Sequence, residues 1–200
     1  MNIIAFGAHP DDIEIGAGGT IARHVAEGDK VMMVVMTGGE EGGADADTRV
    51  KELHESAKIL GVHEVVCLGY PDTDVPESPE VIQKLDALVA RWKPQRAYLP
   101  FTREIHQDHR RTSEQALVAC RNLPQILMYE GPSTFPDFEV HYWIDITSTI
   151  DKKCVSIAAY GSQGEKEILK IDAIRSLNRF RGFQARGTYA EGFNVFRFIQ

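Results

Sequence analysis

The chain has few cysteines. Its 200 residues contain only Cys67, Cys120 and Cys154, and no two of them form a Cys-x-x-Cys pair. Three widely spaced cysteines give neither a disulfide framework nor a thiolate zinc knot. We interpret all three as small buried hydrophobic residues. The candidate metal ligands are instead histidine and carboxylate side chains.

A basic surface and long apolar runs are also missing. With 22 Lys and Arg against 29 Asp and Glu, the formal net charge is −7, which argues against nucleic acid or an anionic membrane as a partner. No apolar run approaches the roughly 20 residues of a membrane helix. The first residues, Met1 to Phe6, lack the basic region of a signal peptide. We therefore expect a cytoplasmic protein with no membrane segment.

Apolar runs alternate with amphipathic stretches along the chain. The length and the 43% hydrophobic content are enough for one domain over residues 1–200. The apolar runs lack a period of two, which is typical of strands buried on both faces of a parallel sheet. Predicted strands lie at Asn2–Gly7, Lys30–Met36, Glu64–Leu68, Arg96–Pro100, Gln125–Tyr129, His141–Ile146 and Asn194–Ile199. Predicted helices lie at Thr20–Glu27, Thr48–Leu60, Pro79–Trp92, Asp108–Arg121, Ser148–Tyr160 and Glu165–Phe180.

This alternation predicts an α/β fold of the Rossmann-like, doubly wound kind. The sheet is expected to be mostly parallel, with the core order 3-2-1-4-5. In that order the first and fourth strands are neighbours, because the direction of winding reverses between them. Their carboxyl ends then lie at the edge where open α/β sheets bind ligands.

Two polar clusters follow those two strands. His9-Pro10-Asp11-Asp12 comes directly after the first, and His106-Gln107-Asp108-His109 follows the fourth after a short loop. Alone, either cluster could be ordinary, since Asp caps helices and isolated histidines are mostly surface residues. At the carboxyl ends of neighbouring strands, the two clusters can form one site.

The residue types in these clusters are typical of a hydrolytic zinc site. Such sites use three His or carboxylate ligands and leave the fourth position for water. His9, Asp12 and His109 would supply the ligands for Zn²⁺ or another divalent transition metal. Neighbouring side chains point in different directions, so Asp11 is expected to face the water rather than the metal. Zinc lowers the pKa of its water to about 7, and Asp11 would accept the proton as general base.

His106 is the fourth candidate in this site. Three positions before His109, it would lie on the same side of the first helical turn. It could donate a hydrogen bond to a developing oxyanion or a proton to a leaving group. Its imidazolium would be held by Asp108 or by solvent.

The segment Ala8-His9-Pro10-Asp11-Asp12-Ile13-Glu14-Ile15-Gly16-Ala17-Gly18-Gly19-Thr20 resembles the N-terminal signature of the PIG-L/LmbE family of zinc-dependent de-N-acetylases. The resemblance continues through Thr37-Gly38-Gly39-Glu40, the second histidine cluster and Tyr189-Ala190-Glu191-Gly192-Phe193. It covers nearly the whole chain.

This resemblance implies hydrolysis of an N-acetyl group from a glucosamine-type sugar, which releases acetate and a free amine. It implies the same zinc ligands and the same base, and it gives His106 a role in stabilising the transition state. It also implies that Arg49 contacts the substrate and that Tyr189 reaches the oxyanion. From the residues alone, Arg49 could equally be a helix-surface residue paired with Glu52 or Asp45, and Tyr189 a packing aromatic.

The expected partner is a small N-acetylated sugar, and we expect a homo-oligomer. One position departs from part of the family. Ile105 stands where members that act on glucosaminyl malate carry an arginine. This departure argues against a substrate carboxylate held at that point.

Three other functions compete with this interpretation of the sequence. A response-regulator receiver needs a phospho-accepting Asp after the third strand, where this chain has Leu68-Gly69-Tyr70-Pro71. A nucleotide-binding loop at Gly16-Ala17-Gly18-Gly19 lacks the Gly-x-Gly-x-x-Gly spacing and the P-loop lysine. A catalytically altered binding homologue, or a hydrolase of non-sugar amides with the same fold, stays open because a fold does not determine a reaction.

Overall fold

The computed structural model describes residues 1–163 and 170–199. Its strands form one sheet in the order β3-β2-β1-β4-β5-β7-β6. The strands are β1 (Asn2–Gly7), β2 (Lys30–Thr37), β3 (Glu64–Tyr70), β4 (Arg96–Pro100), β5 (Gln125–Tyr129), β6 (Tyr142–Asp145) and β7 (Ala190–Phe198). The first five run parallel, and β7 lies antiparallel to both β5 and β6. The predicted fold class and core order are confirmed, and β1 pairs directly with β4.

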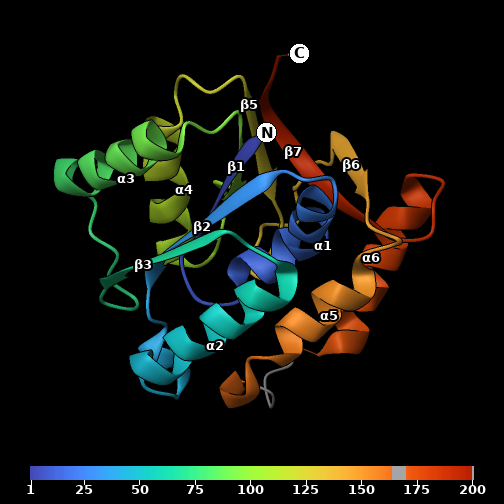
Figure 1. Cartoon of the computed structure of the whole chain (residues 1–200), viewed down its shortest axis with the longest axis horizontal. Coiled ribbons are helices and arrows are strands. Elements are labelled where there is room, and N and C mark those ends of the chain that lie inside the picture. The colour runs from blue at the N-terminus through green and yellow to red at the C-terminus, as the bar shows by residue number, and fades with distance from the viewer. Residues whose placement is uncertain (164–169, 200) are drawn as a thin grey trace.

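Helices cover both faces of this sheet. They are α1 (Asp12–Ala26), α2 (Ala46–Leu60), α3 (Pro79–Trp92), α4 (Gln107–Ala119), α5 (Ile150–Ala158) and α6 (Ile171–Gln184), with short 3-10 turns η1 (Glu40–Gly42) and η2 (Gly161–Gln163). Figure 1 shows α3 and α4 on one side of the sheet and α2, α5 and α6 on the other. This double cover buries both faces of the central strands, which explains their uninterrupted apolar sequences.

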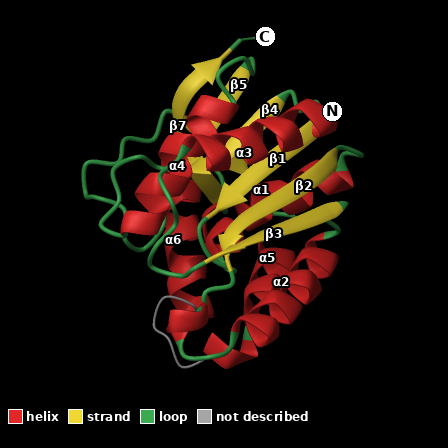
Figure 2. Cartoon of the chain, turned by 90° about the vertical axis from the view of Figure 1, so that its left-hand side faces the viewer, coloured by secondary structure: helices red, strands yellow, loops and turns green. Residues whose placement is uncertain are grey.

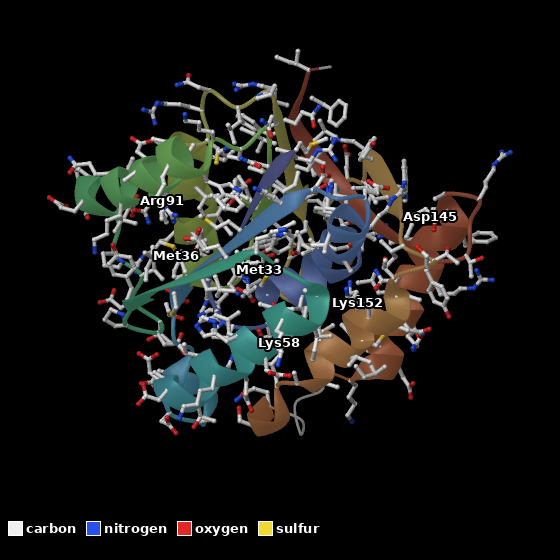
Figure 3. The ribbon with its side chains drawn as sticks, viewed as in Figure 1. Met33, Met36, Lys58, Arg91, Asp145 and Lys152 are labelled. Carbon is white, nitrogen blue, oxygen red and sulfur yellow. The ribbon has the colours of Figure 1, made fainter. Side chains whose placement is uncertain are left out.

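Two hydrophobic cores fill the space between the sheet and its helices. Met33 of β2 belongs to the core that includes α1 and α5, and Met36 of the same strand belongs to the core of α3 and α4. Figure 3 shows both methionines near the middle of the molecule, with Arg91 and Lys58 on outer helix surfaces. Of the helices that the structure describes, none has both the length and the apolarity that crossing a membrane requires.

Helix α1 begins earlier than its sequence predicts. The expected start at Thr20 is wrong, because the helix starts at Asp12 and contains the glycines that the prediction placed before it. A Cβ on Gly16 would lie 2.1 Å from Tyr129 Cδ2, and one on Gly19 would lie 2.7 Å from Ile146 Cδ1. The glycines therefore allow close packing of α1, at a cost in helix propensity that tertiary contacts offset. As a consequence, Asp12 lies in the first turn of a helix.

The C-terminal elements also differ in their bounds. Helix α6 begins at Ile171 and continues to Gln184, four residues beyond the predicted end. Residues 165–169 of the predicted helix lie outside the described residues. Strand β7 begins at Ala190, so the segment Ala190 to Phe193 that the prediction left in a loop pairs with β6.

Candidate metal and active site

The two histidine clusters meet at the carboxyl edge of the sheet. Figure 2 shows the arrowheads of β1, β2 and β3 directed toward one edge. His9 and Asp11 lie between β1 and α1, whereas His106 and His109 lie at the start of α4, which follows β4. Together with the loop after β3, they line a cavity of about 430 Å³. This volume lies within the range of small-molecule sites.

His9, Asp12 and His109 approach one another closely in this cavity. His9 Nδ1 lies 3.3 Å from His109 Nε2, and Asp12 Oδ1 also lies 3.3 Å from His109 Nε2. Asp12 Oδ2 lies 3.6 Å from His9 Nδ1 and accepts hydrogen bonds from the backbone N–H groups of Ala8 and His9, each at 2.9 Å. The backbone of the β1–α1 turn thus fixes the carboxylate, while Oδ1 faces His109.

Acidic groups behind each ring determine which nitrogen faces the cavity. His9 Nε2 lies 2.9 Å from Asp72 Oδ1 and 3.3 Å from Asp108 Oδ2, so this nitrogen donates to carboxylates. His109 Nδ1 lies 3.3 Å from Ser133 Oγ and 3.5 Å from Glu104 Oε2. In the neutral rings, the opposite nitrogens carry lone pairs, and these are the two that face each other.

This donor set fits a tetrahedral divalent cation. Two lone pairs that face each other at 3.3 Å repel unless a proton or a cation lies between them. Ligand atoms bound to one zinc at about 2.0–2.1 Å lie roughly 3.4 Å apart, close to the spacings seen here. The hydrogen-bonded carboxylates behind both rings are the usual outer partners of metal-binding histidines. His9, Asp12 and His109 are therefore suited to hold the metal.

The charges of these groups depend on one another. Burial lowers the pKa of His9, but Asp108, Asp12 and Asp72 outweigh it and raise the pKa well above its ordinary value. Burial acts in the same way on His109, yet Asp12 and Glu104 raise its pKa to about 9. Burial raises the pKa of Asp12, but the two histidines hold it well below its ordinary value. The carboxylates that stabilise a proton on these rings would equally stabilise a cation.

His106 contacts the cavity from the N-cap of α4. Its Nδ1 accepts a hydrogen bond from the backbone N–H of Asp108 at 3.2 Å, which leaves Nε2 as the N–H donor of the neutral ring. Burial and the neighbouring His9 and His109 lower the pKa of His106, so its neutral form is favoured. Ring nitrogens of His9, His106 and His109 also lie within 4.8 Å of one another. His106 can thus serve as a hydrogen-bond donor beside the metal or as an alternative ligand.

Of the two partners expected for the His106 ring, Asp108 and solvent, the first is wrong. Asp108 neither caps α4 nor holds an imidazolium at His106. Its carboxylate instead accepts hydrogen bonds from the backbone N–H groups of Thr73 at 2.7 Å and Val75 at 3.2 Å, besides its contact with His9. Asp108 therefore fixes the loop after β3 against the histidine cluster.

Asp11 occupies an unusual backbone conformation at the N-cap of α1. Its φ of 110° is rare for a residue with a side chain, and such strain is often found at functional sites. Asp11 Oδ2 lies 3.2 Å from Arg49 Nη2, which also donates to the carbonyl of Pro10 at 2.6 Å. Burial and the charge of Asp12 raise the pKa of Asp11 to about 7, against the opposing effect of Arg49. A carboxylate with such a pKa is suited to accept a proton at neutral pH.

The two residues suggested only by family resemblance lie in different places. Arg49 is 3% exposed, contacts Asp11 and lines the cavity, so a surface pair with Glu52 or Asp45 is not its main environment. Tyr189 is not among the described residues that line this cavity. It lies in a shallow hollow on α6, with Arg179 over its ring at 5.9 Å. Its predicted role at the oxyanion stays a prediction.

Sequence reasoning missed Asp72, Glu104 and Ser133. Asp72 follows β3 at the same edge of the sheet, and this position is a signal that could have identified it. Glu104 sits two residues before the second histidine cluster, where nothing in the sequence indicates burial. Ser133 reaches the site through the loop after β5, whose path depends on tertiary contacts.

Comparison with known proteins gives one family match and three informative similar proteins. A family model described as PIG-L, GlcNAc-PI de-N-acetylase, matches residues 4–120. The uncharacterized deacetylase YaiS of Escherichia coli (strain K12) is 38% identical over 142 residues, which cover 68% of this chain and 77% of that protein. The structure of N,N'-diacetylchitobiose deacetylase from Pyrococcus horikoshii, with an inhibitor bound, gives a TM-score of 0.86 at 29% identity and covers 98% of this chain and 83% of the other.

A third similar protein shows how widely the fold is used. GalB, the 4-carboxy-2-hydroxymuconate hydratase of Pseudomonas putida KT2440, gives a TM-score of 0.89 at 22% identity, with coverage of 100% of this chain and 97% of the other. At that identity the likeness concerns the fold alone. The reaction must be argued from the site.

Proposed function

Because the chain belongs to the PIG-L family, we propose that it is a zinc-dependent hydrolase that removes the N-acetyl group from N-acetylglucosamine-type sugars. The family and the deacetylase relatives support deacetylation of such substrates. The metal, the base and the residue roles are our proposal. They rest on the geometry at the carboxyl edge of the sheet.

One observation carries the proposal of a metal. The cavity-facing nitrogens of His9 and His109 approach to 3.3 Å beside Asp12 Oδ1, while carboxylates hold the opposite side of each ring. His9, Asp12 and His109 would hold the zinc ion. When bound, zinc would polarise the acetamido carbonyl and lower the pKa of a water molecule to about 7.

Asp11 is the proposed general base. It lines the same cavity as the proposed ligands, but it is held by Arg49 rather than by the histidines. From there, Asp11 would take a proton from the attacking water and return it to the departing amine. Arg49 would limit the motion of the Asp11 carboxylate and orient it toward the water.

His106 is the proposed oxyanion donor. Because its Nδ1 accepts the capping hydrogen bond from Asp108 N, the neutral ring presents Nε2–H. This N–H would donate to the carbonyl oxygen as negative charge develops there. The role requires the neutral ring, in contrast to the imidazolium that the sequence suggested.

Polar groups on the cavity wall are suited to a sugar. Glu41, Arg49 and Asp72 line the cavity beside the reacting groups and offer both charged acceptors and donors to hydroxyl groups. Glu41 has no role in the proposed chemistry, so its carboxylate can accept hydrogen bonds from hydroxyl groups of the sugar. These groups agree with an N-acetylglucosamine ring, and Ile105 argues against a malate-linked substrate.

The direct test is an amine-release assay on the full chain. N-acetylglucosamine, its disaccharide and inositol-linked and malate-linked forms would be compared, each with and without a metal chelator. We expect metal-dependent release of acetate from at least one of the first three, and weak release from the malate-linked form. Simple non-sugar acetamides would be tested beside them. If the chain released acetate from these alone, its substrate would be another amide and not a sugar.

A further inference from the structure

The loop before α4 and the loop after β5 are joined beside the site. Glu104 and Thr134 form an isolated antiparallel β-bridge. Ile105 N donates to Ser133 O at 2.9 Å, and Phe135 N donates to Arg103 O at 3.1 Å. The backbones of residues 103–105 and 133–135 are thus held together, next to the helix that carries His109.

The Glu104 side chain lies beneath this junction and is 1% exposed. Its Oε2 accepts a hydrogen bond from Ser133 Oγ at 2.6 Å, and its Oε1 accepts one from Thr134 Oγ1. Thr134 Oγ1 in turn accepts from the backbone N–H of Gly131 at 2.8 Å. Glu104 therefore binds two neighbouring hydroxyl groups of one loop, and only one of them contacts a proposed metal ligand.

Counting protons in this group fixes the orientation of each hydrogen bond. The Ser133 hydroxyl has a single hydrogen, which it donates to Glu104. Ser133 Oγ lies 3.3 Å from His109 Nδ1 and can then only accept. In its neutral form, His109 must therefore carry its proton on Nδ1, which leaves the lone pair on Nε2, the nitrogen that faces His9 and Asp12.

We propose that Ser133 and Glu104 are positioning residues that hold His109 in the Nδ1–H tautomer and so prepare Nε2 to bind a metal. This inference rests on the proposed zinc site. It also goes beyond it, because it connects metal affinity to the loop at residues 131–134. Pro132 and Ser133 of that loop line the cavity, so the same hydrogen bonds order part of the substrate-facing wall.

Glutamine at position 104 tests the proposal with almost no change in shape. Its amide NH₂ can donate to Ser133 Oγ, after which the hydroxyl donates to His109 Nδ1 and favours the Nε2–H tautomer. That tautomer carries its lone pair on Nδ1 and leaves none on Nε2, the nitrogen that faces the proposed metal site. In Ser133→Ala, by contrast, Glu104 Oε2 remains 3.5 Å from Nδ1 and can accept directly. Glu104→Gln should therefore weaken zinc binding more than Ser133→Ala.

The measurement is zinc affinity of the metal-stripped full chain, by competition with a chromophoric chelator and without substrate. We expect a loss of about 10- to 100-fold in Glu104→Gln and a smaller loss in Ser133→Ala. Thr134→Ala is the matched control, since it removes the other hydroxyl on Glu104 but does not contact His109. Its zinc affinity should stay within about twofold of wild type. Denaturant unfolding of all three variants separates affinity from stability.

A tautomer measurement gives the second readout. Long-range proton–nitrogen NMR of the metal-stripped chain, at a pH where the His109 ring is neutral, should show His109 protonated at Nδ1 in the wild type and at Nε2 in Glu104→Gln. Wild-type zinc affinity in Glu104→Gln, or an equal loss in Thr134→Ala, would overturn the inference. If the wild type binds zinc with this ranking but releases no acetate, the proposed function fails and the inference stands. If the wild type binds no zinc, both fail.

Discussion

Helix α1 contacts two clusters of buried charged side chains that are organised in opposite ways. One is the cavity cluster around His9, Asp12 and His109. The other is an ion pair between Lys153 of α5 and Glu191 of β7, both no more than 1% exposed. In the ion pair every charge meets its complement, whereas in the cavity two imidazole nitrogens face each other beside one carboxylate. The comparison separates buried charge that stabilises the fold from buried charge arranged for a ligand.

The ion pair is complete within the protein. Lys153 Nζ donates to Glu191 Oε1 at 2.6 Å and to the carbonyl of Ile15 at 2.7 Å. Glu191 also accepts from the backbone N–H groups of Gly19 at 2.9 Å and Thr20 at 2.7 Å. The pair therefore joins α1, α5 and β7 and has no need of a further partner.

In the cavity cluster, the protein's own groups do not satisfy the facing atoms in this way. One of the cluster's closest contacts, at 3.3 Å, joins two ring nitrogens that both present lone pairs when the rings are neutral. Outside the cluster, however, carboxylates and a hydroxyl bind the remote nitrogen of each ring. The protein thus fixes the orientation of the rings but leaves their facing atoms for a cation or a proton. We expect mutations in the cavity to change activity and mutations in the ion pair to change stability.

The largest expected effect on activity comes from Asp11→Asn. An amide cannot accept the proton of the attacking water, so kcat should fall by about 10²- to 10⁴-fold. Zinc content should remain at the wild-type level, because Asp11 is not among the proposed ligands. Asp47→Asn on the exposed start of α2 is the control and should keep wild-type activity. Wild-type activity in Asp11→Asn would remove Asp11 from the mechanism.

Breaking the ion pair should have the largest effect on stability. Lys153→Met leaves the Glu191 carboxylate buried without its cation, which should lower the free energy of unfolding by about 3–5 kcal/mol. Denaturant unfolding measures the change. Lys152→Met alters the neighbouring residue, which is exposed and labelled in Figure 3, and should leave stability nearly unchanged. Similar stability in both variants would mean that the pair does not anchor α1.

A smaller effect is expected where α1 packs closely on β5. In Gly16→Ala, the new Cβ would overlap the ring of Tyr129, which is 2% exposed and donates its hydroxyl to Phe6 O at 2.7 Å. Overpacking of this kind should cost about 1–3 kcal/mol in unfolding free energy. Gly18→Ala, whose Cβ would lie 3.3 Å from Lys153 Cγ, should be less destabilised. A more stable Gly16→Ala would show that the close approach is not required.

The sequence predicts the sheet and the meeting of the clusters because both depend on local signals. The apolar runs of β1 and β4 identify two buried strands, and the doubly wound order makes them neighbours. The start of α1 could not be predicted in this way. Its glycines are poor helix formers, but close packing on Tyr129 and Ile146, more than a hundred residues away, favours them as part of a helix.

The supporting residues of the site escaped prediction for a similar reason. Glu104 and Ser133 contact each other where two loops meet, and no pattern in the sequence predicts that contact. Asp108 was predicted to serve His106, its neighbour in the chain, whereas it contacts His9 and the loop after β3. Local sequence indicates which groups reach the carboxyl edge. Tertiary packing decides which of them contact one another.

In the proposed mechanism, the facing atoms of His9, Asp12 and His109 would hold one catalytic zinc ion. The most direct test is a titration of the chelator-stripped chain with zinc, with acetate release from diacetylchitobiose measured at each step. The account predicts no activity before zinc is added, then a linear rise that ends at one zinc per chain. Full activity in the stripped chain, or zinc bound at one per chain in a His9→Ala, His109→Ala variant, would contradict it.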